Sequence, residues 1–141
     1  MQITTMRTPN QIRKIQAATA IAMSVMTFSA LAANPSEKDK QFLTSYEKIH
    51  AALAADDLAS AKSAAKDIGD AGSDISKANS LADARTAFEK LSEKAKSLIV
   101  GQSGFYVIHC PMLKKDWVQT TDKIANPYGG KDMTTCGEIK K

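Results

Sequence analysis

The chain lacks the residue patterns on which most enzyme sites are built. It has no glycine-rich phosphate loop, no suitably spaced pair of acids and no nucleophile paired with a general base, and it contains only two histidines. His109 precedes Cys110, but neighbouring residues on a strand point to opposite faces. We therefore expect a protein that is not an enzyme.

Without its N-terminal stretch, the chain also has no large excess of one charge sign. The net charge of +4 includes Arg7, Arg13 and Lys14, which lie in an N-terminal stretch without any acid. Without these three bases the net charge is +1, and the lysines alternate with Asp and Glu. Such a mixed surface is typical of a solvated protein and excludes nucleic acid as an expected partner.

The apolar run Ala17–Ala32 has 16 residues, whereas a membrane-spanning helix needs about 20. It follows the basic stretch and ends in Ala30-Leu31-Ala32, with small residues at the positions that a signal peptidase recognises. We predict that residues 1–32 are a signal peptide cleaved after Ala32. Residues 33–141 are then a single periplasmic or secreted domain without membrane insertion.

Residues 36–100, here called the helical part, show apolar residues at helical spacing. Ser36, either Asp56 or Asp57, and Ser80 are candidate caps for three helices. The apolar stripes of these helices are Phe42, Tyr46, Ile49 and Leu53; Leu58, Ala61, Ala65 and Ile68; and Leu81, Ala84, Phe88, Leu91, Ala95 and Leu98. His50 lies beside the first stripe and is expected at the edge of the core. The pattern predicts a mainly α protein with a small antiparallel bundle of two to four helices.

Residues 103–141, here called the C-terminal segment, have a different character. Phe105–Cys110 and Trp117–Thr121 are short runs of aromatic and β-branched residues, and 126–130 form a turn cluster. We expect an irregular segment with short β-strands, packed on the helices through Trp117 and Tyr128.

Sulfur and imidazole groups gather in two short stretches of this segment. Cys110 and Met112 lie in one stretch, Met133 and Cys136 lie in the other, and His109 is a further candidate ligand. Thiolates and thioethers are soft donors that favour Cu(I) and, by extension, Ag(I). The sequence therefore predicts a site for Cu(I) or another soft metal ion.

A disulfide between Cys110 and Cys136 is the alternative, because two cysteines in an exported protein commonly pair. A crosslink closing a loop of this length stabilises a small domain by about 3 kcal/mol in the chain-entropy model. It would remove both thiolates as metal ligands. The residues leave these two interpretations open.

The same residues carry a resemblance to a known family. Three stretches match it, namely Leu81–Ile99, YVIHCPM at 106–112, and IANPYGGKDMTTCGEI at 124–139, together with Trp117. The chain resembles the bacterial exported domain of unknown function 3347, which occurs alone or joined to periplasmic adaptor subunits of heavy-metal efflux pumps. The basic loop 113–116 departs from the family pattern, and Leu113 stands where a related short metal-binding motif has histidine.

This resemblance implies a helical domain with a metal-associated C-terminal segment, in which Cys110, Met112, Met133 and Cys136 contact copper or silver. The leading hypothesis is a periplasmic module that buffers a soft cation or passes it to an efflux adaptor. The competing hypothesis is a disulfide-stabilised structural or protein-interaction module that docks on another envelope protein.

Overall fold

The computed structural model describes residues 34–140, and the predicted signal peptide lies outside these residues. Four α-helices come first, namely α1 (Glu37–Ala54), α2 (Leu58–Lys66), α3 (Ser73–Ser76) and α4 (Leu81–Leu98), with the 3-10 helix η1 (Gly69–Gly72) between α2 and α3. The C-terminal segment contains β1 (Tyr106–Cys110), β2 (Lys115–Gln119), the 3-10 helix η2 (Gly130–Met133) and β3 (Glu138–Ile139). The prediction of a mainly α bundle followed by a short β segment is confirmed.

The predicted helix starts are present. Ser36 forms a reciprocal capping box with Asp39 at the start of α1, and Ser80 Oγ accepts a hydrogen bond from Asp83 N at 3.1 Å at the start of α4. Asp57, rather than Asp56, caps α2 by accepting a hydrogen bond from Ser60 N. The reason is geometric, because Asp56 has a left-handed backbone (φ 58°) that ends the connection from α1.

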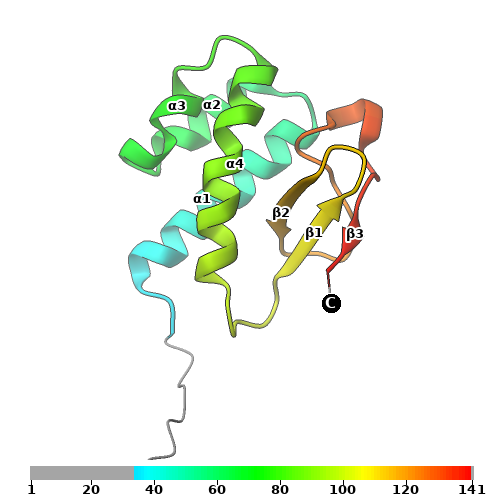
Figure 1. The fold of residues 1–141 in the computed structure, drawn as a ribbon. Coiled ribbons are helices and arrows are strands. Elements are labelled where there is room, and N and C mark those ends of the chain that lie inside the picture. The colour runs from blue at the N-terminus through cyan, green and yellow to red at the C-terminus, as the bar shows by residue number, and fades with distance from the viewer. Residues whose placement is uncertain (1–33, 141) are drawn as a thin grey trace, which may run out of the picture. The chain divides into compact units, whose positions relative to one another are not determined.

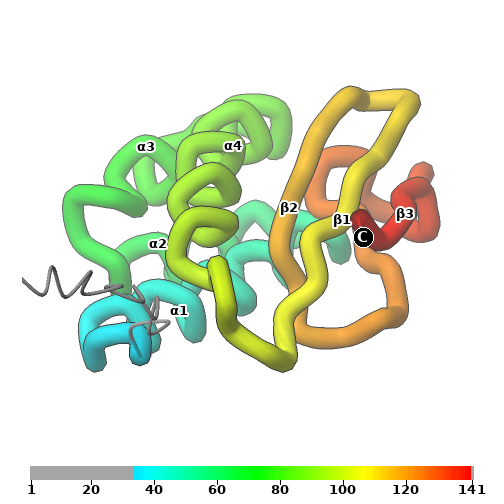
Figure 2. The backbone as a smooth tube through the Cα atoms, turned by 60° about the horizontal axis from the view of Figure 1, so that its bottom comes forward, coloured from blue at the N-terminus to red at the C-terminus, as the bar shows by residue number. Residues whose placement is uncertain are grey.

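The three strands form an antiparallel sheet in the order β2-β1-β3. Ile108 pairs with Trp117 across the β1–β2 hairpin, and Ile139 pairs with Ile108 on the other side. In Figure 1 the sheet stands beside α1 and α4, and Figure 2 shows β2 as the strand nearest the helices. Strand β3 was not predicted, because its two exposed residues carry no strand pattern.

One hydrophobic core joins the helices to the sheet. Tyr46 stacks on Phe88 with ring centroids 4.8 Å apart, and Tyr128 lies edge-on to Trp117 at 6.2 Å. Trp117 is fully buried, as are Ile49, Leu53 and Ile108. The small residues Ala61, Ala65, Ala84 and Ala95 are buried where helices approach each other. The C-terminal segment therefore completes the core of the helical part.

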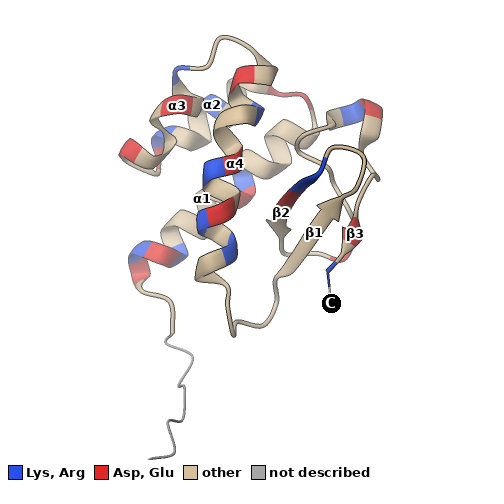
Figure 3. Cartoon of the chain, viewed as in Figure 1, with Lys and Arg blue, Asp and Glu red and all other residues tan. Residues whose placement is uncertain are grey.

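Charged side chains of both signs alternate along the helices, as Figure 3 shows. Among residues 34–140, no helix is long and apolar enough to cross a membrane.

Candidate functional site

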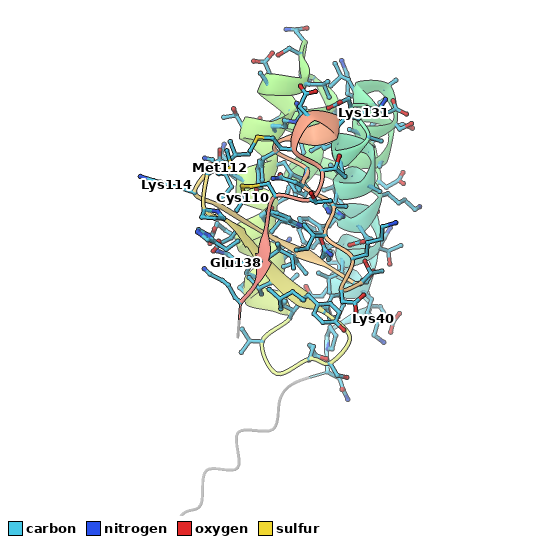
Figure 4. All side chains as sticks on the ribbon, turned by 90° about the vertical axis from the view of Figure 1, so that its right-hand side faces the viewer. Lys40, Cys110, Met112, Lys114, Lys131 and Glu138 are labelled. Atoms are coloured by element: carbon cyan, nitrogen blue, oxygen red, sulfur yellow. A yellow bond between two sulfur atoms is a disulfide. The ribbon has the colours of Figure 1, made fainter. Side chains whose placement is uncertain are left out.

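The β1–β2 hairpin fixes the first pair of sulfur atoms. Cys110 is the last residue of β1 and is fully buried, while Met112 lies in the turn that follows, with 75% of its surface exposed. Lys114 closes this turn with a left-handed backbone (φ 53°). In Figure 4 Met112 and Lys114 project from the same end of the hairpin. A single residue, Pro111, thus separates a buried sulfur from one in solvent.

Asn126 organises the stretch that carries the second pair. Its buried side chain accepts hydrogen bonds from Tyr128 N and Gly129 N at 2.9 Å each, and its amide nitrogen donates to Cys136 O at 2.9 Å. The amide thereby ties the turn at 126–130 to the cysteine ten residues later. Burial makes each of these hydrogen bonds costly to lose.

Arg85 on α4 attaches this turn to the helices. Its side chain donates to Pro127 O at 2.8 Å, to Leu53 O at 3.0 Å and to the carboxylate of Asp56. Asp56 also accepts from Lys131 N at 3.1 Å, and these hydrogen bonds, Arg85 first, hold the pKa of its carboxyl below the usual range. The position of η2 is therefore set by the ends of α1 and α4.

Gly137 allows the chain to pass closely over the sheet after Cys136. A Cβ atom at this position would lie 2.7 Å from Ile108 Cγ2 and 2.9 Å from Trp117 Cη2. Only glycine fits without displacing these buried side chains. The Cys-Gly step of the sequence thus has a packing reason.

The fold joins Cys110 and Cys136 in a disulfide, 26 residues apart in sequence, with Cα atoms 5.6 Å apart. Cys136 is half-buried. The structure therefore shows the disulfide alternative, and in this state the two sulfurs are not available as thiolates.

The other three candidate ligands lie around this bond in different environments. Met112 is exposed in the hairpin turn, and Met133 is half-buried in η2 against the core. Among residues 34–140, these two methionines and two cysteines are the only sulfur-containing side chains. The fold thus brings the two sulfur-bearing stretches, which are distant in sequence, close together in space at one end of the β1–β2 hairpin.

His109 is directed away from Cys110 by the alternation of the strand, and it contacts Asp116 across the hairpin. The distance from His109 Nδ1 to Asp116 Oδ1 is 2.7 Å, and Lys140 and Lys96 donate to the other carboxylate oxygen at 2.7 and 3.2 Å. Burial by itself raises the pKa of Asp116, but the hydrogen bonds from Lys140, His109 and Lys96 outweigh it and hold the pKa well below the usual range. His109 is therefore hydrogen-bonded to Asp116, which also forms ion pairs with Lys96 and Lys140 beside β1.

A hydroxyl network lies between this hairpin and the helices. Tyr46 and Tyr128 Oη atoms lie 3.0 and 2.9 Å from Ser92 Oγ, and Tyr46 accepts from Val118 N at 3.0 Å. Desolvation raises the pKa of both tyrosines. Both therefore remain neutral hydrogen-bonding groups at ordinary pH.

His50 and Asn126 were not among the predicted site residues, although both are buried, His50 on α1 and Asn126 within the C-terminal segment. His50 Nε2 lies 2.7 Å from the carbonyl oxygen of Ala125, and because a carbonyl only accepts, this nitrogen donates. The other ring nitrogen has no hydrogen-bond partner and lies 3.5 Å from a Glu47 oxygen. The prediction that His50 lies at the edge of the core understated its burial. Its place next to the first apolar stripe was the available signal.

No group of three or more His, Cys, Asp and Glu side chains is arranged to hold a metal ion within the described range 34–140. A soft-metal site would therefore depend on the cysteine pair and the methionines.

Comparison with known proteins gave no matching family model, no matching curated protein and no matching solved structure. The family resemblance described above stays a prediction.

Proposed function

We propose that the protein is an envelope module that binds a soft cation such as Cu(I) or Ag(I), and buffers it or passes it to a periplasmic efflux adaptor. One observation carries the proposal: two stretches that each bear a cysteine and a methionine are folded together, with Cys110 and Cys136 Cα atoms 5.6 Å apart. Soft sulfur donors concentrated in one place match the ligand preference of these cations.

The cysteine pair contributes only in its reduced form. Reduction by a dithiol transfers two electrons and two protons to the disulfide, giving two thiols, while the reductant forms its own disulfide. Each thiol that ligates the cation then loses its proton. Because the Asn126 side chain holds the carbonyl of Cys136 and Gly137 packs closely on Ile108 and Trp117, we expect both sulfurs to stay close after the bond opens.

The methionines extend the donor set independently of redox state. A thioether has no proton to lose and no bond to break, so the exposed Met112 offers a sulfur in both states. Met133 lies three residues before Cys136 and supplies a second thioether from η2. We expect weak binding in the oxidised form and stronger binding after reduction.

The test is a Cu(I) titration of the purified protein against bicinchoninate as competing chelator, before and after reduction. The oxidised protein is the matched control, since its sequence is identical and only the thiolates are removed. Reduction is expected to raise the affinity at least about tenfold, which corresponds to about 1.4 kcal/mol. The double variant Cys110→Ser, Cys136→Ser is expected to lose this gain, and Met112→Leu or Met133→Leu to lose a smaller part.

A second candidate function is a disulfide-stabilised structural or protein-interaction module without a metal role. The observation that favours it is the disulfide itself, with Cys110 fully buried, since buried cysteines are usually inert. The number of free thiols on protein taken directly from the envelope distinguishes the two candidate functions. If none is free there, and reduction leaves the Cu(I) affinity unchanged, the metal proposal is wrong and the structural module stands.

A further inference from the structure

A groove of about 660 Å³ lies between α1 and the open end of the β1–β2 hairpin. Leu43 and Ala51 contribute from α1, Phe105 from the residue before β1, and Pro35 from the chain before α1. The volume falls within the range of about 300–1,000 Å³ that is typical of small-molecule pockets. The groove is therefore large enough for a ligand and has an apolar floor.

The charged residues of this groove lie on one helix. Lys40 and Lys48 are exposed on α1, two turns apart, with Glu47 between them. Lys40 pairs with Glu37 at 2.7 Å, and Glu47 faces Thr120 and His50. Lys48 has no carboxylate partner among residues 34–140. An apolar floor beside an unpaired cation is complementary to an anionic amphiphile.

We propose that this groove binds a free long-chain fatty acid, with the acyl chain over Leu43, Ala51 and Phe105 and the carboxylate at Lys48. A peptide fits less well, because its backbone N–H and C=O groups would meet an apolar floor that cannot pair them. An acyl chain has no such groups to satisfy. Its carboxylate stays at the rim, where water and the ammonium solvate it.

This site is separate from the sulfur atoms of the proposed metal module. Phe105 precedes β1 and Cys110 ends it, so five strand residues, about 17 Å, lie between the two ends. Figure 4 likewise shows Lys40 at the lower right of the molecule, well apart from Met112 at the left. Failure of either proposal therefore leaves the other standing.

The test uses sodium dodecanoate as the probe, added to the purified protein below its micelle concentration and followed by amide chemical shifts. We expect saturable shifts at Leu43, Ala51 and Phe105. Lys48→Glu is expected to weaken binding about five- to tenfold, since it replaces an attraction with a repulsion at a solvent-exposed site. Ala51→Trp is expected to abolish binding by filling the groove.

Lys66→Glu on α2 is the matched control, because it reverses an exposed lysine outside the groove and is expected to leave the affinity unchanged. Dodecanol tests the role of the charge and is expected to bind more weakly than dodecanoate. Equal binding of both probes, or equal binding by the Lys48→Glu variant, overturns the proposal. The proposal is also overturned if the protein binds phosphatidylglycerol vesicles but does not respond to dodecanoate. That result would mean that the groove contacts a membrane surface.

Discussion

The helical part and the C-terminal segment bury their residues by different means. The helices satisfy their own backbone groups and approach each other through small residues such as Ala61 and Ala84. The C-terminal segment has only short strands, so its shape depends on the buried Trp117, the amide of Asn126 and the Cys110–Cys136 disulfide. A segment with little regular structure needs such specific contacts, because few repeating hydrogen bonds stabilise it.

Removing the central aromatic residue of the C-terminal segment is expected to have the largest effect. Trp117→Ala deletes a fully buried indole and its hydrogen bond to Gln119, and should lower the free energy of unfolding by about 3–5 kcal/mol. Urea denaturation followed by circular dichroism measures this change. Val100→Ala, at a position with 75% exposure, is the control and should change stability by less than about 0.5 kcal/mol. A loss below about 1 kcal/mol for Trp117→Ala would show that the segment is not part of the common core.

Opening the disulfide should destabilise the segment selectively. The variant Cys110→Ala, Cys136→Ala is expected to lose about 3 kcal/mol, the chain-entropy value for this loop. Hydrogen exchange should speed up first between Ile124 and Lys140, while amides of α1 and α4 keep more protection. Equal loss of protection in both regions would instead mean that helices and segment unfold as one unit.

The Asp116 cluster makes the segment sensitive to acid. Because hydrogen bonds hold the folded-state pKa of Asp116 below its unfolded value of about 3.9, the stabilisation is complete above that pH. It is lost as the pH falls through the folded-state pKa. Asp116→Asn should cost about 1–2 kcal/mol at pH 7, and the difference from the unsubstituted protein should narrow below about pH 4. Denaturation midpoints of both proteins at a series of pH values test this; a constant difference would contradict it.

The smallest expected effects lie in the helical part. Ser36→Ala and Ser80→Ala each remove a cap hydrogen bond at a helix start and should cost about 1 kcal/mol. Ser63→Ala, at an exposed position inside α2, is the matched control and should be neutral or slightly stabilising, because alanine has the higher helix propensity. Thermal denaturation resolves these differences. If the control loses as much as the cap variants, the capping interpretation fails.

The helical part was predictable in some detail because its signals are local. The apolar stripe from Phe42 to Leu53 and the caps at Ser36 and Ser80 appear in the structure as the spacing indicated. The C-terminal segment was predictable only in outline. Strand β2 begins two residues before Trp117, and β3 carries no pattern of its own, because its pairing depends on β1.

The candidate site shows the same division. The residue types in the two sulfur-bearing stretches and their soft-donor chemistry follow from composition and spacing alone. Whether Cys110 and Cys136 meet could not be read from the chain, since it depends on how Asn126, Arg85 and Gly137 place the second stretch. His50 was similarly underestimated, because its partner is a backbone oxygen 75 residues later.

By itself, the sequence determined where helices start, which of their faces are apolar, and that the sulfur atoms of residues 33–141 lie near the C-terminus. The helix starts and the apolar faces depend on residues three or four positions apart, where helical geometry relates neighbours directly. Only the tertiary structure decided that Cys110 and Cys136 are bonded, that His109 is hydrogen-bonded to Asp116, and that a groove lies between α1 and the hairpin. Each of these depends on contacts between distant segments, which are fixed only when the whole core packs.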